Sequence, residues 1–281
     1  MRELNVSEIQ KAVSALLIRA NHEMGADVRE AVEKARLEER SPVARFALDQ
    51  ICENYRVSTE KRLPLCQDTG MAILFAEIGQ DLHIVGGDFT LAVNAGVAEA
   101  YQEGYLRKSV VSDPLYDRVN TGNNCPAVIH TSIVPGDRLR LLAIAKGFGS
   151  ENMSRIAMLP PAAGEEGVLD FIEQCVREAG PNPCPPVIVG VCVGGDFEQA
   201  ALFAKRATAR PVGTHNEDAR YAALEQKALD RLNRLGIGAA GFGGTVTALS
   251  VAIDFLPTHI AGMPVAVSIC CHACRHAEAT L

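Results

Sequence analysis

Nine cysteines are the residues of this sequence best suited to chemistry, because thiolates ligate metals and act as nucleophiles. They are Cys52, Cys66, Cys125, Cys175, Cys184, Cys192, Cys270, Cys271 and Cys274. Their odd number and the adjacent pair at 270 and 271 fit poorly with a framework of disulfides. No apolar segment near the N-terminus resembles a secretory signal, so we expect a cytoplasmic protein that uses some thiols for metal binding or catalysis.

The densest group of metal-binding residue types is the run Cys270-Cys271-His272-Ala273-Cys274-Arg275-His276. Such a run is compatible with a zinc site that stabilises a non-enzymatic interaction module. The second Cys or His pair, which a zinc finger or zinc ribbon carries at a distance, is missing. A zinc-stabilised module therefore stays an alternative to an enzyme.

Two other cysteines lie in segments whose neighbours suit a binding site. Cys66-Gln67-Asp68-Thr69-Gly70 combines a thiol, an amide and a carboxylate in a tight turn before a predicted strand. Pro183-Cys184-Pro185-Pro186 holds its cysteine rigidly between prolines, which suits a fixed metal ligand. Each segment, taken alone, also fits an incidental thiol in a structural loop.

Glycines follow two predicted strands, where backbone N–H groups can approach an anion. The first such segment runs from Lys146 to Ser154, and its lysine adds a positive charge. The second, Gly190 to Gly195, matches neither the dinucleotide fingerprint nor the P-loop pattern, which makes nucleotide binding a weak alternative. The more ordinary uses of these glycines are a flexible turn in the first segment and close packing of a strand against a helix in the second.

Hydrophobic periodicity predicts the elements that position these segments. Residues 1–58 read as a helical N-terminal segment, a possible lobe of its own, in which Ser7 and Gln10 form a capping box. Short mixed sheets flanked by helices follow, with strands predicted at 71–78, 82–85, 187–193 and 264–269. The apolar runs at 127–134 and 138–145 predict a hairpin about Pro135-Gly136-Asp137.

Two later helices complete this reading, one over 88–106 that delivers Arg107 at its end and one from about 217 to Gly236. The mixture of strands and helices predicts the fold class α/β (mixed α+β), with residues 1–281 as one domain.

Composition excludes several classes of function. Hydrophobic residues make up 48% and charged residues 22%, an ordinary globular balance. The net charge is -7 and the basic residues are scattered, so nothing indicates binding to nucleic acid or to an anionic membrane. The longest apolar stretch, at 186–193, is far too short to span a bilayer.

Together these segments resemble the cluster-binding half of the class I, iron–sulfur-dependent fumarate hydratases, in the fumarase–tartrate dehydratase family of hydro-lyases. The resemblance runs from the helical start almost to the C-terminus. It is carried by Cys66-Gln67-Asp68-Thr69-Gly70, Gly104-Tyr105-Leu106-Arg107, Asn120-Thr121-Gly122-Asn123-Asn124, Lys146 to Ser154, Asn182-Pro183-Cys184-Pro185-Pro186, Pro257-Thr258-His259-Ile260 and Cys271-His272. The order and spacing of these segments make chance a poor explanation.

The resemblance implies that Cys66, Cys184 and Cys271 hold three irons of a [4Fe-4S] cluster. Spacing alone does not choose these three cysteines from nine. Three protein ligands would leave one iron with an open position, and such an iron can act as a Lewis acid on a substrate hydroxyl and carboxylate.

The resemblance also implies the substrate contacts of such an enzyme. Gln67, Asp68, Arg107 and the backbone of Gly149 would contact a dicarboxylate, and the planar guanidinium of Arg107 suits bidentate binding of a carboxylate. Asp68 and His259 would form a catalytic pair that handles protons, with the carboxylate setting the protonation of the imidazole. Taken alone, His259 reads as a structural histidine and Arg107 as a surface ion-pair former.

The expected reaction is the reversible hydration of fumarate to malate, a step of the tricarboxylic acid cycle. The resemblance implies that a separate β subunit supplies further substrate contacts, and that two α chains form a homodimer in an α₂β₂ assembly. L(+)-tartrate dehydratase, or another dicarboxylate hydro-lyase, is the nearest alternative. Phe148 and Thr245 depart from the residues usual in the family; the first is expected to narrow the pocket and the second to alter substrate or partner contacts.

Overall fold

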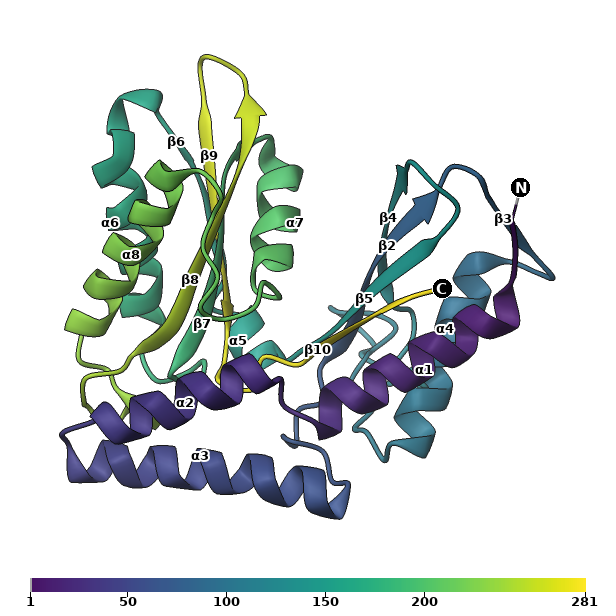
Figure 1. Cartoon of the computed structure of the whole chain (residues 1–281), viewed down its shortest axis with the longest axis horizontal. Helices are drawn as coiled ribbons and strands as arrows, with labels where there is room; N and C mark the ends of the chain where they lie inside the picture. Colours follow the sequence, from purple (N-terminus) through teal and green to yellow (C-terminus); the bar gives the residue numbers. More distant parts are fainter. Residues whose placement is uncertain (1) are drawn as a thin grey trace. The chain divides into compact units, whose positions relative to one another are not determined.

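The protein folds into two compact units in the structure, a computed structural model that describes residues 2–281. Unit 1 holds the residues up to Gly25, Tyr55–Phe148 and Arg275–Leu281, and unit 2 holds Ala26–Asn54 and Gly149–Cys274. Each unit has its own four-stranded sheet and its own hydrophobic core (Figure 1). The mixed α/β fold class is therefore confirmed.

Unit 1 is built on a sheet with the strand order β10-β5-β2-β4. β2 pairs in parallel with β4 and antiparallel with β5, and β5 pairs antiparallel with β10. A short parallel pair, β1 with β3, lies outside this sheet. The elements of the unit are β1 (Arg2–Asn5), α1 (Val6–His22), β2 (Met71–Gly79), β3 (Leu82–Val85), α4 (Phe89–Glu103), β4 (Val128–Val134), β5 (Leu139–Lys146) and β10 (His276–Thr280).

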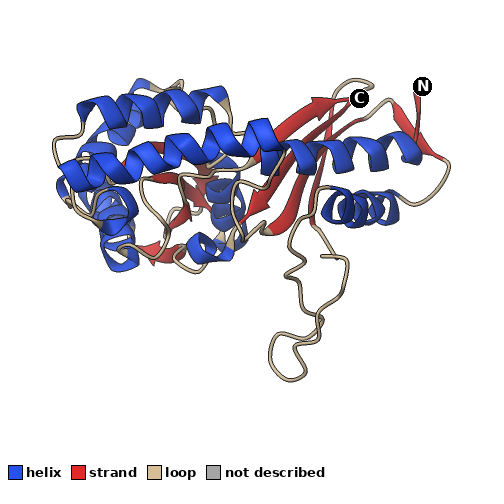
Figure 2. Ribbon diagram, turned by 90° about the horizontal axis from the view of Figure 1, so that it is seen from below, coloured by secondary structure: helices blue, strands red, loops and turns tan. Residues whose placement is uncertain are grey.

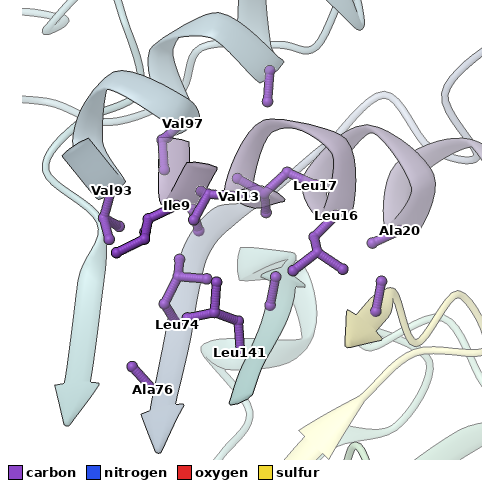
Figure 3. Close-up of a cluster of buried hydrophobic side chains, with 14 of the residues drawn as sticks. Ile9, Val13, Leu16, Leu17, Ala20, Leu74, Ala76, Val93, Val97 and Leu141 are labelled. Carbon is purple, nitrogen blue, oxygen red and sulfur yellow. The ribbon is translucent and has the colours of Figure 1, made fainter. Parts of the chain in front are cut away.

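The core of unit 1 forms where α1 and α4 cover the sheet (Figure 3). Ile9, Val13 and Leu17 recur at helical spacing on α1, and each is fully buried. They pack with Leu74 of β2 and Leu141 of β5, whose side chains point to the same face of the sheet. The core therefore fixes the ends of β2 and β5, where the predicted site residues of this unit begin.

A long loop over residues 104–127 joins α4 to β4 (Figure 2). A connection of this length without regular elements usually has a function of its own. Its internal contacts include the bridge between Val111 and Asn120, and the Asp113 side chain accepts hydrogen bonds from the backbone N–H groups of Leu115 and Tyr116. The loop is thus an ordered segment, and Arg107 lies near its start.

Unit 2 has three layers around a sheet with the order β6-β9-β7-β8. α6 and α8 cover one face, and α7 covers the other (Figure 1). β7 pairs in parallel with β8 and antiparallel with β9. The elements are α2 (Ala26–Glu38), α5 (Phe148–Glu151), β6 (Arg155–Leu159), a 3₁₀ turn (Pro161–Ala163), α6 (Gly164–Ala179), β7 (Val187–Gly195), α7 (Phe197–Ala207), α8 (Ala219–Arg234), a 3₁₀ turn (Ala239–Gly241), β8 (Ala248–Thr258) and β9 (Met263–Cys270); α5 begins one residue before the boundary.

The glycines at 190–195 serve packing in this unit. A Cβ atom at Gly190 would lie 2.2 Å from the carbonyl oxygen of Ala204 on α7. Helix and strand can approach this closely only because position 190 has no side chain. Asp196 then caps α7 by accepting a hydrogen bond from the N–H of Gln199.

The hairpin predicted about Pro135-Gly136-Asp137 is wrong, because β2 lies between β4 and β5 in the sheet. The turn instead passes over the end of β2, where the Gln80 N–H donates to the Val134 carbonyl and the Asp81 N–H to the Gly136 carbonyl. Two runs adjacent in sequence therefore need not be neighbours in a sheet.

The predicted capping box is also wrong. α1 begins at Val6, and the side chain of Asn5 caps it by accepting from the N–H of Ser7. Asparagine caps a helix as well as serine does, so the cap lies two residues earlier than predicted. The third helix, α3 (Pro42–Lys61), begins directly after Ser41, whose hydroxyl accepts from the Ala44 N–H.

The helices of residues 1–58 are divided between the units, in contrast to a single lobe. α1 belongs to unit 1 and α2 to unit 2, and the boundary falls within α3. The reason is that α1 packs on α4 and β5, whereas α2 packs on β8. None of the helices in the described part of the chain is long and apolar enough to cross a membrane.

Candidate functional site

The Cys66–Gly70 loop of unit 1 is fixed through Asp68. One carboxylate oxygen of Asp68 accepts from the Gly70 N–H at 3.0 Å, and the other accepts from the Phe148 N–H at 2.8 Å. The Asp68 carbonyl accepts from the guanidinium of Arg275 at 2.5 Å, and Arg275 is buried. The carboxylate therefore joins this loop to the end of β5, a structural task that stands beside its predicted catalytic one.

Gly70 lets the loop lie directly against β5. Its φ is +76°, and a Cβ atom there would come within 2.6 Å of the Lys146 carbonyl group. Both the backbone conformation and the close approach exclude a side chain at this position. The glycine thus sets how near Asp68 lies to the Lys146–Phe148 segment.

Arg107 is joined to the same loop through its backbone. The Thr69 hydroxyl donates to the Arg107 carbonyl at 3.0 Å, while the Arg107 side chain is exposed. The buried Tyr101 hydroxyl lies 2.9 Å from the Thr69 carbonyl and 2.8 Å from the Gly70 carbonyl and donates to this pair. Burial raises the pKa of Tyr101, so its hydroxyl keeps the donating proton at neutral pH.

Unit 1 therefore brings together four of the predicted site residues. Gln67 is exposed, and its amide oxygen lies 3.4 Å from the Cys66 sulfur. Asp68 follows it directly, and Arg107 is joined to Thr69 in the same hydrogen-bonded network. A thiol, an amide, a carboxylate and a guanidinium thus belong to one network of loops.

Unit 2 brings together two of the three predicted cluster ligands. Cys184 is exposed, and its φ of +55° lies in the left-handed region. Its carbonyl accepts a hydrogen bond from the N–H of His272, the residue after Cys271, at 3.4 Å. The loop around Cys184 is anchored by the Pro185 carbonyl, which accepts from the Ala240 N–H at 2.7 Å. Cys184 and Cys271 are consequently neighbours at the end of the sheet where β7 begins and β9 ends.

Gly149 lies at the same end of unit 2. A Cβ atom at this exposed glycine would be 3.7 Å from the carbonyl oxygen of Asn182, two residues before Cys184. Its backbone N–H belongs to the short segment that follows β5. The predicted substrate contact at Gly149 is therefore near the Cys184–Cys271 pair.

His259 lies at the opposite end of β9 from Cys271. It occupies the turn between β8 and β9, where it is exposed and its Nδ1 accepts from the Ala261 N–H at 3.2 Å. β9 runs from Met263 to Cys270, and a strand rises about 3.3 Å per residue, so the separation is on the order of 25 Å. The turn that joins β8 to β9 can be followed at the top of Figure 1. His259 and the cysteine pair of one chain are therefore far apart.

The environment of the nine thiols distinguishes the three predicted ligands from the rest. Burial raises the pKa of both Cys175 and Cys192 to about 12. Burial and a hydrogen bond to Glu33 raise the pKa of Cys52 to about 11, and burial raises that of Cys125. A thiol that resists ionisation is a poor metal ligand.

Two further thiols, Cys270 and Cys274, are buried, and Cys274 donates to the Thr208 carbonyl. Cys66, Cys184 and Cys271 are the partly or fully exposed thiols that remain. This donor set fits a cluster with three thiolate ligands. Within either unit, the described residues form no group of three or more His, Cys, Asp or Glu side chains that could hold a metal ion.

Sequence reasoning missed three residues that hold these loops. Tyr101 and Arg275 are buried in unit 1 and donate to the backbone of the Cys66–Gly70 loop. In unit 2, the buried carboxylate of Glu39 accepts from the backbone N–H and the hydroxyl of Thr245. Their positions in sequence give no signal, because each acts through a backbone group far away in the chain.

Comparisons with known proteins identify the family of this chain. Residues 10–280 match the family model described as fumarate hydratase (Fumerase). The "Putative L(+)-tartrate dehydratase subunit alpha" of Methanocaldococcus jannaschii is 38% identical over 255 residues, which cover 89% of this chain and 90% of that protein. The L(+)-tartrate dehydratase subunit alpha of Escherichia coli is 29% identical over 274 residues, covering 96% and 89%. This chain belongs to the fumarate hydratase (Fumerase) family.

Proposed function

We propose that this chain is the α subunit of an iron–sulfur hydro-lyase that reversibly hydrates fumarate to malate together with a separate β subunit. One observation carries the proposal: the accessible thiol of Cys66 lies on the loop that bears Gln67 and Asp68, and the accessible thiols of Cys184 and Cys271 belong to neighbouring segments near Gly149. The family supports hydro-lyase chemistry, and the relatives named as alpha subunits support a partner chain. We propose the cytoplasm and the tricarboxylic acid cycle as its setting.

The proposed [4Fe-4S] cluster would take Cys66, Cys184 and Cys271 as its three protein ligands. When bound, it supplies one iron without a protein ligand as a Lewis acid for a hydroxyl and a neighbouring carboxylate. The chain's own residues then select and orient the substrate. The Arg107 guanidinium binds the second carboxylate with two parallel hydrogen bonds, and the Gln67 amide and the Gly149 N–H complete the contacts.

The geometry limits how Asp68 and His259 can form the proposed catalytic pair. Four carbons span a distance far shorter than β9, at whose opposite ends His259 and Cys271 lie. A substrate held near the cysteine pair of one chain would therefore meet His259 of a second copy. The pair is thus proposed together with the homodimer of α chains in an α₂β₂ assembly. Replacing His259 by Asn should lower turnover and leave the iron content unchanged; an unchanged turnover would contradict its role.

L(+)-tartrate is the second candidate substrate, because the compared relatives carry that name. Tartrate differs from malate by one hydroxyl, and a group of this size changes binding by about 1–3 kcal/mol. Phe148 adjoins Gly149 and donates its N–H to Asp68, so this departure from the family can shift the preference.

The test is anaerobic reconstitution of the full chain with iron and sulfide, followed by assays with the β subunit. We expect about four irons and four sulfides per chain, with hydration of fumarate faster than dehydration of L(+)-tartrate. The opposite ratio of rates would assign the tartrate reaction. Bound zinc without sulfide would support the zinc-stabilised module instead and would overturn the proposal.

A further inference from the structure

Asn124 lies near the end of the long loop over residues 104–127, in the segment Asn120-Thr121-Gly122-Asn123-Asn124, to which no function has been given so far. Its side chain is completely buried, and its φ is +60°. Asparagine tolerates this left-handed conformation better than most residues. A buried amide must find hydrogen-bond partners, and the partners of Asn124 show what it joins.

The amide of Asn124 bonds to both segments that carry the proposed substrate contacts of unit 1. Its oxygen accepts from the Ser109 N–H at 2.7 Å and from the Val110 N–H at 3.2 Å, two and three residues after Arg107. Its nitrogen donates to the Gly70 carbonyl at 3.2 Å, directly after Gln67, Asp68 and Thr69. One side chain therefore connects the Arg107 segment to the Cys66–Gly70 loop.

These bonds close a ring. From Gly70 the ring passes through the Asn124 amide to Ser109, along the backbone to Arg107, and from the Arg107 carbonyl through the Thr69 hydroxyl back to the loop. A ring of this kind restrains the distance between its two sides, because each connection limits the movement that the other allows. The amide is required, since the position needs an acceptor on one side and a donor on the other.

We propose that Asn124 is a positioning residue that fixes the Arg107 guanidinium relative to Gln67 and Asp68. The inference rests on the proposed function, because the restraint by Asn124 would give Arg107 and the Gln67–Asp68 segment the spacing that a dicarboxylate needs. Asn124 is buried and does not touch the substrate. Its effect on the reaction therefore passes through Arg107.

The kinetic test replaces Asn124 by Asp in the full chain, assayed with the β subunit. Aspartate keeps the acceptor and loses the donor, and it sets an oxygen against the Gly70 carbonyl. We expect kcat/KM for the dicarboxylate to fall about 10- to 100-fold. Asn123→Asp is the matched control, because Asn123 is exposed and its side chain accepts from the Cys125 N–H, which aspartate also does.

A double-mutant cycle separates positioning from general loss of structure. In an Arg107→Ala background, where the guanidinium is gone, Asn124→Asp should lower kcat/KM by less than about twofold. The full 10- to 100-fold loss in that background would show an effect that does not pass through Arg107 and would overturn the inference.

Hydrogen exchange tests the ring even if neither fumarate nor tartrate proves to be a substrate. Asn124→Gly removes the side chain and still accepts a positive φ. In this variant the amides of residues 107–110 and the Cys66–Gly70 loop should both exchange faster, whereas Asn123→Asp should leave them unchanged. Unchanged exchange in either segment would overturn the inference, while faster exchange in both without activity on these substrates would count against the proposed function alone.

Discussion

The two loops that present the proposed cluster ligands are held in different ways. The Cys66 loop of unit 1 depends on side chains, since Tyr101, Asn124 and Arg275 all bond to its backbone. The Cys184 loop of unit 2 depends on the backbone, through its prolines and through bonds from the N–H groups of Ala240 and His272. Conservative substitutions of distant side chains should therefore disturb the Cys66 loop. The Cys184 loop should instead respond to substitutions that change the conformational freedom of the backbone.

The largest expected effect tests whether the two loops share one task. Cys66→Ser and Cys184→Ser each replace a thiol that is proposed to bind iron. Because a Lewis-acidic metal contributes several kcal/mol to a transition state, each variant should lose activity at least about a thousandfold, together with iron. Iron analysis and the fumarate assay measure both. Cys52→Ser is the control and should retain its iron; retention by either of the other variants would separate the two loops in function.

Alanine at two glycines compares the loops as structures. At Gly70 in unit 1, an added Cβ atom would collide with the Lys146 carbonyl. At Gly241 in unit 2, it would lie 2.4 Å from the Pro181 side chain. Both positions also have positive φ, so each variant should lose about 3 kcal/mol or more of unfolding free energy in urea. Gly122 has a φ of +77° and open space around it, so Gly122→Ala should cost about 1 kcal/mol. Equal costs at all three sites would show that close approach is unimportant in both loops.

Glu39→Gln tests the side-chain support that unit 2 does use. Burial acts to raise the pKa of Glu39, but hydrogen bonds from Ser41, Thr245 and Arg40 outweigh it and leave the pKa lowered. Losing these charge-assisted bonds should cost about 2 kcal/mol at pH 7.

The pH dependence of the Glu39 effect has a defined sign. A carboxylate with a lowered folded-state pKa stabilises the fold above its unfolded value, near 4.5, and loses this contribution as the pH falls through the folded value. The difference in unfolding free energy between wild type and Glu39→Gln should therefore be constant from pH 7 to about pH 5 and shrink below. A difference that grows on acidification would contradict this account.

Tyr101→Phe is the mildest change of the four and acts on the loop of unit 1. It removes the hydroxyl that donates to the Thr69 and Gly70 carbonyls. The expected cost is about 1–2 kcal/mol of unfolding free energy, with a smaller effect on activity than Asn124→Asp, because Tyr101 bonds to one side of the site only. An effect on kcat/KM larger than that of Asn124→Asp would show that the loop alone, rather than its spacing from Arg107, governs binding.

The sequence predicted those parts of the fold that depend on local pattern. The runs at 71–78 and 187–193 became β2 and β7 because continuous apolar residues suit central strands, and the helix predicted over 88–106 became α4. Strand neighbours could not be read in this way, since the partner of β4 is β2, which lies far from it in the chain. Periodicity also gave no strand at β8 or β10.

The candidate site was predictable in its residue types more than in its geometry. Motifs placed Gln67, Asp68 and Arg107, and the fold joins them through Thr69. Cys271 follows His259 by only twelve residues, which suggests that the two are close, but the extended strand β9 between them separates them in space. Separating Cys184 from Cys192 by residue pattern was impossible, because only the folded chain exposes one thiol and buries the other.

The left-handed backbone of Cys184 has a consequence for how this chain can evolve. A side chain in this conformation costs about 1–2 kcal/mol, and glycine does not bear that cost. Selection for thermal stability alone would therefore favour glycine at position 184 and remove the thiol. The loop is less stable than its fold allows, and a library screened only for heat resistance would be expected to lose the proposed cofactor first at this residue.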